Sequence, residues 1–209
     1  MDRPNRSDTR SALIEAAERL LAARGFGGVT AVEITKEANA RNNSAVRYHF
    51  GSMENLIRAV FESRLEALDA VRMEQLSALD QTGAGEDLPR LIDVIIRPLI
   101  DACSTKSGRR YALILNQLTT DPRFDLEELV GDHRPKSIAI LTERIEHLLA
   151  NLPVDIRKAR LRQLNSVAAT LLADHARQIE RGVAPNIDQA AREATVTLTA
   201  FLTAPHAPF

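Results

Sequence analysis

Apolar residues recur at intervals of three and four along nearly the whole chain, and this helical spacing constrains the fold more than any other feature. Almost no segment alternates apolar and polar residues in the manner of a half-buried strand. Turn-forming residues separate the periodic segments, among them Gly25, the 81–85 segment and the Asp121–Pro122 pair. The sequence therefore predicts an all-α fold.

The boundaries of the predicted helices follow from capping residues and helix breakers. Thr30 and Glu33 form a capping-box pair, and Ser52 and Asn186 are further N-cap residues. Pro98 should kink or break the helix that contains it. We expect helices at about 8–24, 31–37, 43–49, from 52 to the 81–85 loop, 88–102, 109–118, 124–130, 136–150, 155–181 and 186–202. The fourth of these should bury one face made of Leu56, Val60, Leu65, Leu68 and Val71.

Composition narrows the class of protein. The 209 residues suffice for one large domain or for a small and a medium one, and 44% of them are hydrophobic. The net charge of −1 gives no sign of nucleic-acid binding over the whole chain, but residues 1–64 hold ten Lys and Arg against eight Asp and Glu. The single cysteine, Cys103, excludes an intrachain disulfide. No segment resembles a signal peptide or a membrane span, so we expect a cytoplasmic protein without a membrane partner.

Residues 30–56 carry the strongest functional signal. They predict two short helices joined by a tight turn, followed at once by a longer helix. Val46 and Phe50 of the second short helix should point inward and anchor it to the core, while the other face of the helix is polar and aromatic. A helix-turn-helix of this kind places one helix in the major groove of DNA while the other crosses the phosphate backbone.

The predicted reading helix contains side chains suited to DNA contacts. Arg47 can donate two hydrogen bonds to guanine, or it can bind a phosphate, and the sequence leaves both roles open. Asn43 can read adenine or bind phosphate, and Ala45 is small enough to approach a thymine methyl group. Ser44 and Tyr48 can donate to phosphate oxygens, and the amide groups near Thr30 can attract a phosphate.

The pattern resembles the DNA-binding region of the tetracycline-repressor (TetR) family over residues 8–65. The resemblance rests on Ala16-Ala17, Gly25-Phe26, Thr30 with Val32 and Ile34, Ala38, Tyr48-His49-Phe50, Ser52, and Glu54 with Leu56. It implies that His49 contacts a phosphate. The DNA-binding candidates are thus Thr30, Arg41, Asn42, Asn43, Ser44, Ala45, Arg47, Tyr48 and His49.

This sequence departs from the family pattern in three places. Asn39 stands where the family commonly has Gly in the turn, and Asn tolerates a left-handed backbone better than most residues. The segment from Ala38 to Phe50 is one residue longer than the commonest form. Met53 replaces a residue that is often a phosphate-binding Lys, so we expect that contact to be missing here.

The resemblance also implies an organisation for the whole chain. Residues 1–52 would form the DNA-binding domain, with 1–7 as a flexible arm, and residues 53–209 would form a helical domain for ligand binding and dimerisation. The implied protein is a homodimeric regulator of double-stranded DNA, by default a repressor, that is controlled by a small, largely hydrophobic effector.

Two sets of residues in the larger domain are candidates for these roles. The effector pocket is expected among apolar residues with a few polar groups, namely Leu91, Ile95, Leu113, Asn116, Gln117, Leu141 and His175. Stripes rich in small side chains on the last two helices suit a dimer interface, namely Val167, Ala168, Leu171, Leu172, Ala190, Ala191, Ala194 and Leu198. These stripes could instead face the core of the subunit.

Other functions have weaker support in the sequence. A helical protein-interaction module remains the alternative to a DNA-binding regulator. We find no nucleophile motif and no Gly-rich phosphate loop, so neither an enzyme nor a cofactor is expected. Glu143 and His147 share a helix face, but a solvated pair is the simpler interpretation and no metal is expected.

Overall fold

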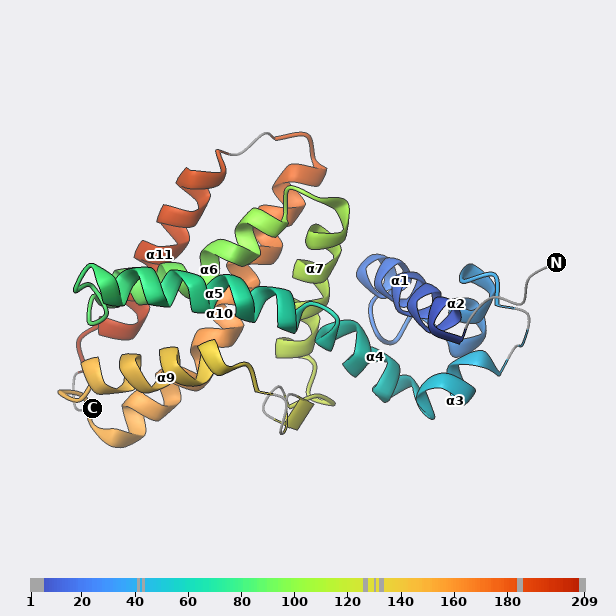
Figure 1. Cartoon of the computed structure of the whole chain (residues 1–209), viewed down its shortest axis with the longest axis horizontal. Coiled ribbons are helices and arrows are strands. Elements are labelled where there is room, and N and C mark those ends of the chain that lie inside the picture. Colours follow the sequence, from blue (N-terminus) through green and yellow to red (C-terminus); the bar gives the residue numbers. More distant parts are fainter. Residues whose placement is uncertain are drawn as a thin grey trace. The chain divides into compact units, whose positions relative to one another are not determined.

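The computed structural model describes residues 6–40, 42, 44–125, 128–129, 131, 134–183 and 186–206. Within these residues the regular elements are helices, as predicted (Figure 1). The chain divides into two compact units, Met1–Arg64 and Leu65–Phe209. None of the described helices is long and apolar enough to cross a membrane.

The smaller unit contains α1 (Arg6–Arg24), α2 (Ala31–Glu37), α3 (Ala45–Phe50) and α4 (Met53–Glu62). Helix α1 packs against α2 and α4, and α3 packs against both of its sequence neighbours. The core is formed by fully buried apolar side chains from three of these helices, among them Leu13, Leu21, Ile34, Leu56 and Val60. Helix α4 therefore belongs to the small unit. The compact unit ends at Arg64, whereas the domain boundary predicted from the sequence lies between residues 52 and 53.

The single helix expected from residue 52 to the 81–85 loop is two helices. Helix α4 ends at Glu62 and α5 (Leu65–Gln81) begins three residues later. At the break, the Ser63 hydroxyl donates to the carbonyl of Val60 over 2.7 Å. The interruption shifts the helical phase, so Val71 is 42% exposed rather than buried, and Arg72 lies inside at 4% exposure. Neither Gly nor Pro lies at this break, so the spacing of apolar residues in the sequence predicted one continuous helix.

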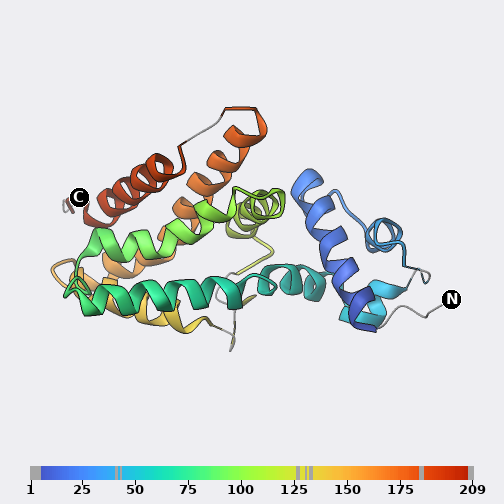
Figure 2. The ribbon, with the colours of Figure 1, turned by 45° about the horizontal axis from the view of Figure 1, so that its top comes forward.

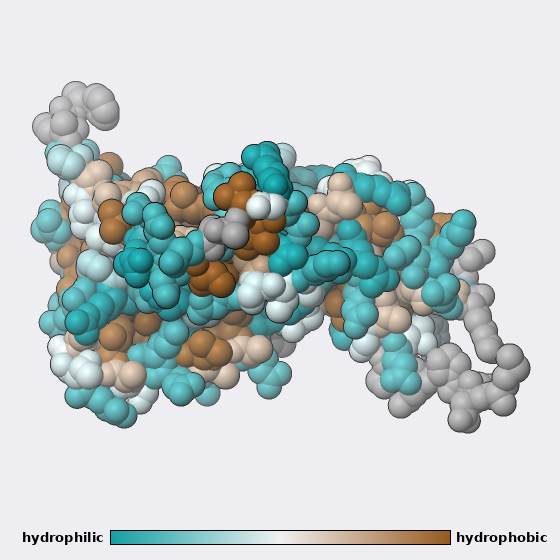
Figure 3. Space-filling view, turned by 90° about the horizontal axis from the view of Figure 1, so that it is seen from above, coloured by the Kyte–Doolittle hydropathy of each residue, from teal (hydrophilic) through white to brown (hydrophobic). Residues whose placement is uncertain are grey.

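The larger unit continues with α6 (Leu88–Ala102), α7 (Lys106–Thr120), α9 (Lys136–Leu148), α10 (Val154–Glu180) and α11 (Ile187–Thr203). Helix α6 lies between α5 and α11, and α10 runs beside α7 (Figures 1 and 2). Leu91, Ile92, Ile96, Ile114 and Leu141 are fully buried between these helices. On the face shown in Figure 3, hydrophobic residues reach the surface in separate spots between hydrophilic ones.

Helix α6 continues through Pro98, which we expected to kink or break it. Pro98 is buried together with Val94 and Leu99, so packing holds the helix across the missing N–H group. The short helix expected at 124–130 falls partly outside the described residues, where only 128 and 129 are assigned as helical.

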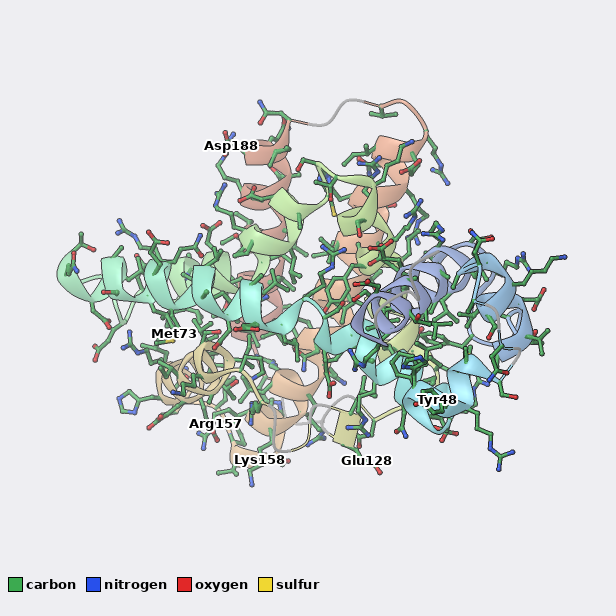
Figure 4. The ribbon with its side chains drawn as sticks, turned by 45° about the vertical axis from the view of Figure 1, so that its right-hand side comes forward. Tyr48, Met73, Glu128, Arg157, Lys158 and Asp188 are labelled. Carbon is green, nitrogen blue, oxygen red and sulfur yellow. The ribbon has the colours of Figure 1, made fainter. Side chains whose placement is uncertain are left out.

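Ion pairs and hydrogen bonds fix the outer helices of this unit. Arg97 in α6 donates to Asp93 over 2.7 Å and to Asp188 over 3.1 Å. Asp188 lies at the beginning of α11 (Figure 4), so Arg97 joins the two helices. The Thr195 hydroxyl of α11 donates to the other oxygen of Asp93 over 3.2 Å. These contacts orient α11 against α6.

Candidate nucleic-acid interface

Helix α2 begins with the capping box that the sequence predicts. The Thr30 hydroxyl accepts a hydrogen bond from the backbone N–H of Glu33 over 3.3 Å, and the Thr30 N–H donates to the Glu33 carboxylate over 2.9 Å. Arg24 at the end of α1 donates to the same carboxylate over 2.7 Å. These hydrogen bonds lower the pKa of Glu33, because they stabilise its charged form. The capping box therefore also ties α1 to α2.

The turn after α2 contains a left-handed residue at Asn39, where the family commonly has Gly. Asn39 adopts a φ of 51°, in the left-handed region that Asn tolerates better than most residues. The following Ala40 N–H returns to the carbonyl of Thr35 over 3.1 Å. Asn39 thus takes the place of the usual glycine without loss of the tight turn.

A local hydrogen bond precedes helix α3, and contacts from α4 and α1 hold its end in place. Asn42 lies just before it and accepts a hydrogen bond from the N–H of Ser44 over 2.9 Å. At the other end, the Asn55 amide of α4 donates to the carbonyl of Phe50 over 2.8 Å. Val46 and Phe50 are buried, as predicted, and the Arg10 guanidinium of α1 lies 5.1 Å from the centre of the Phe50 ring.

The opposite face of α3 presents polar and aromatic side chains to solvent. Arg47 and Ser44 are exposed, and Tyr48 is 64% exposed (Figure 4). His49 packs edge-to-face on the Tyr48 ring, with ring centres 5.0 Å apart. A surface hollow beside them joins the start of α1, the turn and α3, and its lining includes Thr9, which the sequence gave no reason to select. Six candidates are therefore described on or next to α3, namely Asn42, Ser44, Ala45, Arg47, Tyr48 and His49.

Two of the predicted DNA contacts meet obstacles in this geometry. Ala45 is only 4% exposed, so its methyl group packs within the unit and cannot reach far toward a thymine. Thr30 directs both its N–H and its hydroxyl to the Glu33 carboxylate, each over 2.9 Å, and a phosphate would have to displace that group. Arg41 and Asn43 lie outside the described residues.

The predicted effector-pocket residues lie on four helices of the larger unit. Leu91 and Leu141 are fully buried, and Asn116 accepts a hydrogen bond from the Thr170 hydroxyl over 3.1 Å. His175 is 6% exposed, and its Nε2 has no hydrogen-bond partner in the described part of the chain. Burial lowers the pKa of His175, which favours the neutral ring. A common cavity lined by the seven residues remains a prediction.

Sequence reasoning overlooked a buried arginine in the same unit. Arg72 lies on the inner face of α5 and donates from Nη2 to the carbonyl of Ile95 over 2.9 Å. Burial lowers the pKa of its guanidinium to about 10, so the group is still charged at neutral pH. The available signal was its position seven residues after Leu65 and four before Leu76, on an otherwise apolar face.

Most of the predicted dimer stripe belongs to the core of the subunit. Five of its eight residues are buried by the chain's own packing, namely Ala168, Leu172, Ala191, Ala194 and Leu198. This is the alternative that the sequence left open, and it arises because α10 and α11 pack on each other and on α7 and α6. Val167, Leu171 and Ala190 retain partial exposure, and Val196 of α11 is 64% exposed.

Comparison with known proteins identifies the smaller unit. Residues 13–60 match the family model described as bacterial regulatory proteins, tetR family. This range spans α1 from Leu13 to Val60 of α4, and so contains the whole helix-turn-helix. No curated protein matches the chain.

Solved structures share the fold over nearly the whole chain. A tetR-family transcription regulator from Shewanella sp. PV-4 is 15% identical, with a TM-score of 0.62 over 91% of this chain and 95% of that one. One from Marinobacter aquaeolei VT8 is 16% identical, with a TM-score of 0.56 over 93% and 95%. NalD from Pseudomonas aeruginosa, described as the secondary repressor of the MexAB-OprM multidrug efflux pump, is 20% identical, with a TM-score of 0.58 over 93% and 96%.

The matched family region thus lies within the unit whose helix α3 is anchored by Phe50 and exposes Arg47 and Tyr48. The likeness of fold extends through the larger helical unit. Residues 13–60 therefore match the DNA-binding region of the bacterial tetR family of regulatory proteins, and the fold of the whole chain is similar to that of solved tetR-family regulators.

Proposed function

We propose that the protein is a transcriptional repressor that binds a near-palindromic operator as a homodimer and leaves it when a small molecule binds. The exposed face of α3, with Arg47 and Tyr48 outward and Val46 and Phe50 anchored beneath, carries the proposal. A fixed helix with outward donors is what major-groove recognition requires. The protein would act in the cytoplasm, by binding and not by catalysis.

Two-fold symmetry would set the form of the operator. Each subunit would place α3 in one major groove, with half-sites about 34–36 Å apart or at a multiple of that spacing. Tyr48 and Ser44 would donate to phosphate oxygens, and His49 would support this edge of the contact. Arg47 would lie closest to the base edges, where a guanidinium can recognise guanine.

The subunits would associate through the outward faces of α10 and α11. Val196 is the strongest candidate, because it is an apolar side chain that remains 64% exposed within the subunit. Val167, Leu171 and Ala190 would contribute from their partly exposed positions. Val196→Arg should shift the mass measured by light scattering from dimer to monomer. The matched change Val32→Arg in α2, at a residue 58% exposed, should leave the mass unchanged.

The effector would bind in the helical core of the larger unit, among α6, α7, α9 and α10. The apolar walls there, with Asn116, Gln117 and His175 as polar groups, suit a largely hydrophobic small molecule. A coupling free energy of about 1–3 kcal/mol would weaken operator binding roughly 5- to 150-fold. NalD, which is similar in fold, is described as a repressor, and this supports repression rather than activation by this chain.

The test is selection of random duplex DNA by the purified full-length protein at low and high salt. The proposal expects one palindromic sequence, enriched at low salt and lost at high salt, because phosphate contacts release counterions. Enrichment of a non-palindromic half-site would contradict the dimeric mode of binding. No enrichment, also after unfolding and refolding to remove any bound small molecule, would reject DNA recognition.

A further inference from the structure

Arg72 is a charged side chain at a position of α5 where the pattern of the helix would place a leucine. It is 4% exposed and shares the inner face with Leu65, Leu68, Leu76 and Leu79, which follow one another at helical spacing. An arginine is rarely buried to this degree unless another group compensates its charge. The position therefore calls for an explanation beyond packing.

The hydrogen bonds of Arg72 leave its guanidinium only partly satisfied. Nη2 donates to the Ile95 carbonyl of α6, but Nε is buried and has no hydrogen-bond partner among the described residues. Among the ion pairs between described residues, none includes Arg72. An incompletely bonded donor on a buried cation costs free energy, and a bound anion would recover that cost.

The acidic group that acts on Arg72, Asp69, already accepts a hydrogen bond from another residue. Asp69 lies one turn before Arg72 and its negative charge acts on the guanidinium. Its carboxylate nevertheless accepts the backbone N–H of Ser137 over 2.8 Å, and so caps the beginning of α9. Asp69 therefore moderates the charge of Arg72 without occupying its Nε.

A second unsatisfied group belongs to Ser137, the residue whose backbone N–H donates to Asp69. Ser137 is fully buried, and within the part of the chain that the structure describes its hydroxyl has no hydrogen-bond partner. Since Asp69 contacts the backbone of Ser137 and acts on Arg72, both residues border the same carboxylate, from α9 and α5. The buried Tyr111 of α7 also acts electrostatically on Arg72. Three helices thus bring polar groups together inside a largely apolar core.

We propose that Arg72 binds the anionic head of the effector, a monocarboxylate whose remaining part is apolar. Nε of Arg72 would donate to one carboxylate oxygen, and the Ser137 hydroxyl would be a second donor. These two hydrogen-bond donors suit a singly charged carboxylate better than a phosphate group, which needs more donors. The inference rests on the proposed function, and it adds a charge class to an effector otherwise expected to be hydrophobic.

The test compares acids with uncharged molecules of the same shape on the full-length protein. Decanoate is paired with decanamide and decanol, and benzoate with benzamide, so that an aliphatic and an aromatic carboxylate are both tried. The melting temperature is measured with each compound. At least one acid should raise it by about 5 °C at a saturating concentration, while its neutral partner should not.

Variants separate binding from stability. Arg72→Met should keep or raise the melting temperature without added compound, since it removes an incompletely paired buried charge, and should lose the shift with the acid. Ser137→Ala should reduce that shift. Arg144→Met is the control, because Arg144 forms an ion pair with Asp80 at the surface of the same unit, and it should keep the full shift. If Arg72→Met does not fold, Arg72→Gln retains a donor for Ile95 and should also lose the shift.

Three results would overturn the proposal. The first is that neither acid raises the melting temperature of the unchanged protein. The second is that an acid still raises the melting temperature of Arg72→Met or Arg72→Gln. The third is that these variants melt at a much lower temperature and the acids have no effect on them. The last would make Arg72 a structural residue. Failure of the DNA selection together with an Arg72-dependent shift would reject the regulatory role and leave the carboxylate site standing.

Discussion

The carboxylate of Asp69 in α5 accepts a hydrogen bond from the backbone N–H of Ser137 at the beginning of α9, over 2.8 Å. The residue before this helix is Pro135 at the N-cap, whose side chain cannot cap. A residue 68 positions earlier in the chain therefore supplies the cap that the local sequence lacks. This contact also fixes α9 beside α5, next to Arg72.

Asp69→Ala should lower the free energy of unfolding by about 1–2 kcal/mol, because it leaves a backbone N–H at a packed helix end without its acceptor. Asp69→Asn keeps an acceptor oxygen and should lose less. Urea unfolding monitored by circular dichroism measures both. Equal loss in the two variants would show that the negative charge near Arg72 matters more than the hydrogen bond.

Gly108→Ala should destabilise the larger unit by about 1–3 kcal/mol or prevent its folding. A methyl group at this position would lie 1.8 Å from the carbonyl oxygen of Ala102, in the tight connection between α6 and α7. Gly27→Ala is the control, since nothing lies within 4 Å of the added group there. Thermal unfolding compares the two. An undiminished melting temperature for Gly108→Ala would contradict the close approach of α6 and α7.

Arg47→Ala should weaken binding to the selected operator by about 1–3 kcal/mol and relax the preference at one base position, if Arg47 reads a base. An equal loss on all sequences would assign the contact to a phosphate. Lys106→Ala at the exposed beginning of α7 removes a charge far along the chain from α3 and outside the proposed dimer interface, and it should change neither quantity. Fluorescence anisotropy with a panel of single-base variants of the operator measures the difference.

Stability should fall on acidification because of His175. Burial lowers its pKa in the folded state below the ordinary value of 6.5, and the neighbouring charge of Asp174 opposes this in part. The unfolded chain then takes up a proton that the folded protein does not. The contribution of His175 to the free energy of unfolding is fully present above about pH 6.5. It is lost as the pH falls from there through the pKa of the folded state, and the total loss is about 1.4 kcal/mol for each unit by which folding lowers the pKa.

His175→Leu should reduce this loss when melting temperatures at pH 7.5 and 5.5 are compared. The exposed His147 of α9 offers a control, and His147→Leu should retain the pH dependence of the unchanged protein. The same loss in His175→Leu as in the unchanged protein would assign the acid sensitivity to other groups.

The features that the sequence predicts well are those decided within one helical turn. Asn186 accepts the N–H of Gln189 over 3.1 Å, and Ser52 accepts that of Asn55 over 3.1 Å, because an N-cap needs only a hydroxyl or amide three residues before the N–H that it bonds. Gly25 and Gly182 adopt positive φ at helix ends for an equally local reason. The resemblance of residues 30–56 to a helix-turn-helix rests on such local features, and Asn39 preserves its turn.

The tertiary structure decided which face of each helix is buried and where a helix stops without a breaker. The break after Glu62 places Arg72 inside and Val71 outside, and Pro98 stays within a continuous helix because its neighbours pack around it. The small residues of α10 and α11 permit close approach to any partner, so their pattern alone could not distinguish the subunit core from a dimer interface. By itself, the sequence determined the all-helical class, the capping residues Thr30, Ser52 and Asn186, and the helix-turn-helix pattern, because these depend on residues near one another in the chain. Packing between distant segments determined the burial of Ala45, Leu172 and Arg72, because burial is a property of the assembled helices.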